Sequence, residues 1–143
     1  METNKKQTID IETLVNRDSH TVWECWTNPD HITKWNNASA DWHTPIAEND
    51  LRIGGKFRSR MEAKDGSNGF DFSGIYTKVD KGKEIEYILD DDRKVHISFE
   101  TKGDKTIIKE TFEAEDINSI ELQRNGWQSI LNNFKHYVES IQI

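Results

Sequence analysis

The stretch GWQSILNNFKHYV, residues 126–138, carries the clearest secondary-structure signal in the chain. Apolar side chains recur here at steps of three and one, and polar residues fill the positions between them. This spacing places the apolar side chains on one stripe and predicts a long amphipathic helix near the C-terminus. The stripe is formed by Trp127, Ile130, Leu131, Phe134, Tyr137, Val138 and Ile141.

Most of the chain before this helix alternates apolar and polar residues in short segments, as half-buried β-strands do. Residues 8–15 predict a first strand, and strand signals accumulate again from Trp42 onward. The DGSNG segment, residues 65–69, is typical of a hairpin turn, and Gly74 predicts a β-bulge. The later strand segments are residues 56–63, 70–79, 84–89, 94–100 and 105–114.

Two short helices are predicted between the first strand and the later series. Ser19 is expected to cap the first helix, and Asn28 is expected to cap the second, whose first position is Pro29. The second helix should end near Trp35. We expect residues 1–7 to be a flexible tail and residues 8–143 to form a single α+β domain. The long helix has enough apolar area to cover one face of an antiparallel sheet, so we expect it to lie there.

The composition indicates a folded domain with a thin, aromatic interior. Hydrophobic residues make up 34% of the chain and charged residues 31%, but there are five Trp, three Tyr and six Phe among its 143 residues. Disordered chains are poor in large aromatics. The net charge of −7 makes nucleic acid an unfavourable partner.

The sequence gives no sign of export or of membrane insertion. It has one cysteine, Cys25, and neither a signal peptide nor an apolar run long enough to span a bilayer. We therefore expect a cytoplasmic protein without a membrane span, existing as a monomer or a homodimer. Cys25 is expected to be a small buried hydrophobe.

Several short motifs follow one another along the chain: VWECWTNPDHITKWN (22–36), DLRIGGKFRSRM (50–61), SGIYTKVDKGKEIEYIL (73–89) and GWQSILNNF (126–134). In this order they resemble proteins like the C-terminal domain of the activator of the Hsp90 ATPase, within the START-like (SRPBCC) superfamily. The resemblance covers about residues 8–140 and includes the Thr-rich last strand. It implies a helix-grip, Bet-v-1-like fold, in which a curved antiparallel sheet wraps around the C-terminal helix and leaves a cavity.

Such a cavity would be lined by the aromatic and aliphatic residues of the sheet, of the two short helices and of the C-terminal helix. The alternative is that these side chains interlock as a solid core, which periodicity cannot distinguish from a hollow one. His43 is the one histidine placed near the expected cavity mouth, with a possible ligand or acid–base role. The candidate lining residues are Trp35, Trp42, His43, Phe57, Phe72, Tyr76, Phe99, Trp127, Ile130, Leu131 and Phe134.

Other chemistry-bearing residues favour structural roles. Gly54-Gly55 lacks the pattern of a phosphate-binding loop and predicts a positive-φ turn. The three aspartates at residues 90–92 predict a solvated hairpin turn, because they lack the spacing of a calcium loop. Arg58, Arg60 and Glu62, which alternate with Phe57, should face solvent, as should Arg52. We expect no metal, no cofactor and no catalytic residues.

The function favoured by the sequence is non-enzymatic binding of a small hydrophobic ligand between the sheet and the helix. Two alternatives remain open. One is a protein-binding module that interacts with a chaperone, as the family name implies, with a closed interior. The other is an enzyme of the cyclase or hydrolase kind, which requires at least two ionisable groups converging in the cavity.

Overall fold

The computed structural model describes residues 7–141, so most of the predicted N-terminal tail lies outside the described residues. The chain begins with β1 (Thr8–Val15), α1 (Ser19–Thr27) and α2 (Pro29–Trp35). Six further strands and one helix follow in the predicted order. They are β2 (Trp42–Asn49), β3 (Lys56–Ala63), β4 (Gly69–Asp80), β5 (Glu84–Leu89), β6 (Lys94–Lys102), β7 (Lys105–Glu113) and α3 (Ile120–Ser140).

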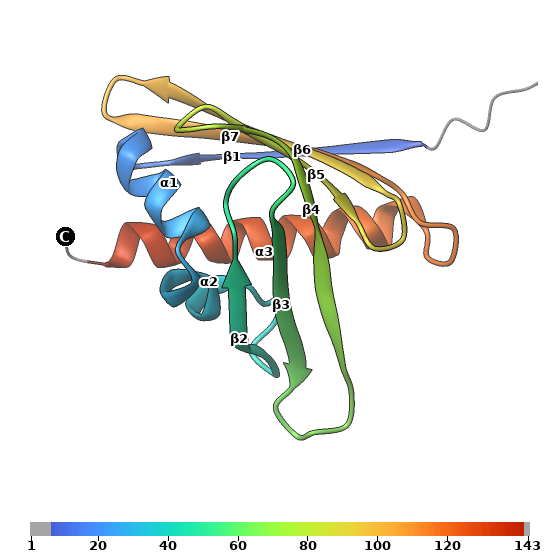
Figure 1. Cartoon of the computed structure of the whole chain (residues 1–143). Helices are drawn as coiled ribbons and strands as arrows, with labels where there is room; N and C mark the ends of the chain where they lie inside the picture. The colour runs from blue at the N-terminus through green and yellow to red at the C-terminus, as the bar shows by residue number, and fades with distance from the viewer. Residues whose placement is uncertain (1–6, 142–143) are drawn as a thin grey trace, which may run out of the picture.

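The seven strands form one antiparallel sheet in the order β1-β7-β6-β5-β4-β3-β2. Strands β2 to β7 are a meander of neighbouring hairpins, and β1 closes the far edge by pairing with β7, with Ile11 opposite Glu110. The sheet curls around α3, and α1 and α2 lie at one end of that helix (Figure 1). This arrangement confirms the predicted helix-grip architecture.

Helix α3 extends further toward the N-terminus than the motif that predicted it. It begins at Ile120, after Ser119, whose side chain accepts a hydrogen bond from the Leu122 N–H. Its polar face is tied to β1: Lys135 Nζ donates to the Leu14 carbonyl at 2.7 Å. Phe134 is 0% exposed and lies with Leu131 and Val138 in the main apolar core.

Three local features of the sequence have separate outcomes. Asn28 caps α2 as predicted, by accepting a hydrogen bond from the Asp30 N–H at 2.9 Å. The prediction that Ser19 caps α1 is wrong, because Asp18 occupies the N-cap position and the Ser19 hydroxyl bonds Thr101 instead, at 2.6 Å. Gly54 has φ of 84°, which confirms the positive-φ turn.

Gly74 is not the site of the β4 bulge. It pairs regularly with both Phe57 and Leu89, and the register shift lies between Tyr76 and Lys78. A Cβ at Gly74 would lie only 2.4 Å from the Ile88 carbonyl oxygen. The glycine therefore allows close approach of the two strands, a second reason for glycine inside a strand.

The charged residues of β3 lie on the outer face, as expected from alternation. Arg58 Nε donates to Glu48 at 2.8 Å, and Arg60 Nε donates to Glu62 at 2.9 Å. Cys25 is buried, as predicted, and burial raises the pKa of its thiol to about 11. Residues 90–92 lie in the turn between β5 and β6.

Candidate functional site

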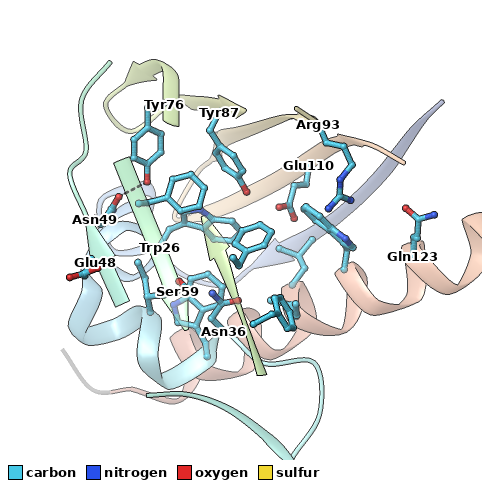
Figure 2. A pocket seen from close by; sticks show the side chains of 18 of the residues that line it. Trp26, Asn36, Glu48, Asn49, Ser59, Tyr76, Tyr87, Arg93, Glu110 and Gln123 are labelled. Carbon is cyan, nitrogen blue, oxygen red and sulfur yellow. Dashed lines mark hydrogen bonds between the residues drawn. The ribbon is translucent and has the colours of Figure 1, made fainter. Parts of the chain in front are cut away.

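A cavity of about 330 Å³ lies between the inner face of the sheet and the N-terminal half of α3 (Figure 2). The size falls at the lower end of the range typical of small-molecule sites. Its wall combines eight aromatic residues, three aliphatic residues and eight polar or charged residues. The lining residues are Trp26, Ile32, Trp35, Asn36, Glu48, Asn49, Phe57, Ser59, Phe70, Phe72, Tyr76, Tyr87, Arg93, Glu110, Glu115, Gln123, Trp127, Ile130 and Leu131.

Helix α3 supplies one wall through Trp127, Ile130 and Leu131. These residues follow each other at helical spacing, so a single stripe of the helix reaches the cavity. The Trp127 ring stacks on Phe112 of β7, with centroids 3.8 Å apart and planes 9° from parallel. This stacking joins the helix to the sheet and fixes the indole at the edge of the cavity.

The opposite wall is a set of mutually packed rings from β3, β4 and β5. Phe57 meets Tyr87 edge-on at 4.7 Å and Tyr76 at 5.2 Å. The Tyr76 hydroxyl donates to Asn49 Oδ1 at 2.5 Å, and Asn49 Nδ2 in turn donates to the Thr27 carbonyl at 2.7 Å (Figure 2). The rings are therefore held in place by contacts that do not involve a ligand.

Seven of the eleven candidate lining residues border the cavity, and four do not. Trp42 lies one layer further out, against Phe70, with the ring centroids 6.0 Å apart. His43 lies on β2 beside Glu62, with Nε2–Oε1 of 3.9 Å and 44% of its side chain exposed. The seven that border the cavity are Trp35, Phe57, Phe72, Tyr76, Trp127, Ile130 and Leu131.

Phe99 and Phe134 are buried but do not line the cavity, and both pack against Trp26, which does. The Trp26 ring meets Phe99 at 5.7 Å and Phe134 at 4.8 Å, in edge-to-face geometry. Both phenylalanines therefore belong to the solid part of the core beneath α1. Trp26 itself lines the cavity and was not among the predicted residues, because a helix as short as α1 does not define its orientation from sequence.

The polar residues of the lining are the main feature that sequence reasoning missed. Glu110 lies on β7 in the same inward row as Ile108 and Phe112, both fully buried. The signal was present in the strand KTIIKETFE, where period-two alternation places Glu110 at a position otherwise occupied by apolar side chains.

The Glu110 carboxyl is buried and has no partner. The residue is 6% exposed, and burial alone raises the pKa of its carboxyl to about 8. Within residues 7–141, no group donates a hydrogen bond to this side chain or forms an ion pair with it. Every fully enclosed side-chain nitrogen or oxygen in the same residues does have a hydrogen-bond partner, so the Glu110 oxygens must remain in contact with the cavity.

The other polar lining residues at this end already have partners. Arg93 Nε donates to Asp91 Oδ2 at 2.8 Å. Gln123 Nε2 donates to the Asn118 carbonyl at 2.8 Å, and its Oε1 accepts from the Glu115 N–H at 2.9 Å. The N–H of Asn118 donates to the Glu115 carboxylate and keeps the pKa of that group below its usual value. These bonds organise the loop between β7 and α3.

No group of three or more His, Cys, Asp or Glu side chains in the described part of the chain is arranged to hold a metal ion. Across those same residues, no helix is long and apolar enough to cross a membrane.

A curled antiparallel sheet wrapped around a long C-terminal helix defines a helix-grip protein of the START-like (SRPBCC) superfamily. Residues 17–139 match the family described as Activator of Hsp90 ATPase homolog 1-like protein, and the chain belongs to that family. A comparison with curated proteins gave no match.

Solved structures agree with this assignment. The AHSA1-like protein from Aeromonas hydrophila is 43% identical, with a TM-score of 0.89, and the alignment covers 94% of this chain and 93% of that one. A protein from Cytophaga hutchinsonii is 49% identical with a TM-score of 0.81, covering 92% of each chain. A protein from Chromobacterium violaceum, at 21% identity, shares the fold with a TM-score of 0.84, covering 94% of this chain and 99% of that one.

Proposed function

We propose that this protein binds a small, largely apolar molecule in the cavity between the sheet and α3. The observation that carries the proposal is the cavity itself, of about 330 Å³, with eight aromatic and three aliphatic residues in its lining. A chain of this size normally fills its interior to the density of an organic crystal. A space of this volume is instead typical of a ligand-binding site.

The energetics permit useful binding. Covering about 300–400 Å² of apolar surface at roughly 25 cal/mol per Å² yields about 7.5–10 kcal/mol before the entropy of association is subtracted. Because Phe57, Tyr76 and Tyr87 already pack against one another, little further ordering of the wall is needed. The expected dissociation constants are therefore about micromolar to millimolar.

The two alternatives receive less support from the same geometry. A chaperone-binding module, the activity to which the family description refers, needs no internal space. A cyclase or hydrolase needs two ionisable groups acting together. Arg93 and Glu115 are engaged in loop contacts, and burial raises the pKa of Tyr87 well above its usual value. Glu110 is thus the lining group best able to exchange a proton near neutral pH.

The test is to fill the cavity from α3. Leu131→Trp adds an indole at the cavity wall, whereas Leu122→Trp adds one to the same helix at a site that is 59% exposed and outside the lining. We expect the uncharged dye N-phenylnaphthylamine to bind the parent and Leu122→Trp, with enhanced fluorescence, and not to bind Leu131→Trp.

Thermal unfolding separates blocking from misfolding. A cavity accommodates the added ring, so Leu131→Trp should melt within a few degrees of the parent. A filled core would be destabilised by about 1–3 kcal/mol. A parent that does not bind the dye, together with a strongly destabilised Leu131→Trp, would contradict the proposal and favour the chaperone-binding module, for which a pull-down with the chaperone's middle domain is the next experiment.

A further inference from the structure

The unpartnered carboxyl of Glu110 is a specific feature of the cavity wall. A carboxyl group at such a position loses its hydration and gains nothing in return, so buried carboxyls are ordinarily paired or hydrogen-bonded. In residues 7–141, every fully enclosed side-chain nitrogen or oxygen has a hydrogen-bond partner, whereas the Glu110 carboxyl borders the cavity without one. A group of complementary chemistry in the cavity would satisfy Glu110 as well.

The surroundings of Glu110 favour a positive charge on that group. Tyr87 on β5 lies close enough to interact electrostatically with Glu110. Trp127 stacks on Phe112, which occupies the next inward position of β7 after Glu110. Aromatic faces beside a carboxylate attract an ammonium group through the ring quadrupole and a charge-assisted hydrogen bond together.

The charged groups around this end of the cavity leave room for such a cation. Arg93, in the turn between β5 and β6, also lines the cavity, but its guanidinium is paired with Asp91 at 2.8 Å. Glu115, after β7, adds a further negative charge. Helix α3 contributes the neutral Gln123 and Trp127 to this end, and the strand neighbours of Glu110 on β1 and β6 are Ile11 and Ile97.

We propose that the ligand is an apolar molecule bearing a basic amine, and that the Glu110 carboxylate binds its ammonium group inside the aromatic cavity. This inference rests on the proposed function and adds the chemical class of the ligand. The apolar body would lie along Phe57, Phe72 and the α3 wall. An uncharged apolar ligand would supply no partner for the Glu110 carboxyl.

Binding of an amine then involves a defined proton transfer. Because burial raises the pKa of Glu110 to about 8, its carboxyl is mostly protonated at pH 7 when the cavity is empty. An ammonium ligand favours the carboxylate, so the Glu110 proton is released to solvent as the ion pair forms. The affinity for amines should rise by up to about tenfold per pH unit from pH 6 toward pH 8, because one proton is released.

The experiment compares three probes that share a phenylalkyl body: phenylbutylamine, phenylbutanol and phenylbutyrate. Each is titrated at pH 7.5 against the protein loaded with N-phenylnaphthylamine, and dye displacement gives its affinity. The variants are Glu110→Gln, which keeps the size of the side chain, and Glu113→Gln as a control. Glu113 lies on the same strand with its side chain on the outer face, where it accepts from the Lys94 N–H at 2.7 Å.

We expect the parent and Glu113→Gln to bind the amine about tenfold or more tightly than the alcohol, the usual size of a charge-assisted hydrogen bond. In Glu110→Gln the amine should lose this advantage and its pH dependence, while the alcohol stays within about threefold of its parent affinity, because the apolar contacts are unchanged. Calorimetry in two buffers of different ionisation enthalpy should show one proton released on amine binding to the parent only.

Four other outcomes would overturn the inference. An amine preference that survives in Glu110→Gln overturns the role of Glu110. Tightest binding of phenylbutyrate would overturn the inference in favour of anion recognition by Arg93, and equal binding of amine and alcohol would overturn it while leaving the apolar site intact. If neither the dye nor the alcohol binds the parent, the proposed function fails, and the inference fails with it.

Discussion

Glu110 makes the stability of the ligand-free protein depend on pH in a way that one substitution can isolate. Its carboxyl has an ordinary pKa of 4.5, which burial raises to about 8 in the folded state. A carboxyl whose folded-state pKa is raised destabilises the fold when it ionises. The contribution of the protonated Glu110 carboxyl to the free energy of unfolding is therefore fully present below about pH 4.5. It is lost as the pH rises through about 8.

The size of the effect follows from proton linkage. Between the two pKa values the folded state holds one more proton than the unfolded state, so the free energy of unfolding falls by about 1.4 kcal/mol per pH unit. From pH 5.5 to pH 7.5, Glu110 alone should reduce the free energy of unfolding by about 2–3 kcal/mol, because the carboxyl begins to ionise in the folded protein near the upper limit. This is a large part of the stability of a typical small domain.

Urea unfolding at the two pH values, followed by tryptophan fluorescence, measures this loss. The informative quantity is the difference between the parent and Glu110→Gln, because any contribution from the other ionisable groups is common to both. We expect the change in unfolding free energy between the two pH values to be smaller in Glu110→Gln by about 2–3 kcal/mol, and that of Glu113→Gln to match the parent. Equal pH dependence in the parent and Glu110→Gln would show that Glu110 ionises in the folded protein without penalty, and the burial argument would be wrong.

Three further expectations concern other parts of the fold. Phe134→Ala should reduce the free energy of unfolding, measured in urea, by about 3–5 kcal/mol, because a fully buried ring that packs α3 against α1 and α2 is lost. A loss below about 1 kcal/mol would mean that α3 does not cover the core. Gly74→Ala should cost about 1–3 kcal/mol, because its Cβ would lie 2.4 Å from the Ile88 carbonyl oxygen, and a neutral effect in the same assay would contradict the close strand approach. Elemental analysis of the purified protein should find no stoichiometric metal, and one zinc or iron per chain would overturn that prediction.

The sequence was informative about the fold wherever a repeating pattern met a large buried surface. The stripe from Trp127 to Val138 predicted α3 because a helix repeats about every 3.6 residues, and strand alternation located the strands along the chain. Local details that depend on tertiary contacts were less accessible. Ser19 bonds a distant strand instead of capping α1, and no local pattern reveals Thr101 as its partner.

The candidate site was predictable only in part, for two physical reasons. Periodicity tells which side chains point inward but not how deep they lie, so Phe99 and Phe134, which pack against Trp26, could not be separated from true lining residues. Charged residues were assigned to solvent by default, which holds for Arg58 and Arg60. The same assumption concealed Glu110, although its position in the inward row of β7 was readable from alternation alone.

The position of Glu110 between two apolar residues of the inward row indicates that the residue serves a function rather than the stability of the fold. An apolar side chain there would continue the row of Ile108 and Phe112 and would avoid burying an ionisable group. The carboxyl instead lowers the free energy of unfolding at neutral pH, because the unfolded state ionises more readily. Natural sequences depart from local rules of packing mainly where function requires it. A ligand whose positive charge pairs with the Glu110 carboxylate would raise the free energy of unfolding again when it binds. The burial of this carboxyl would therefore favour cationic ligands over neutral ones.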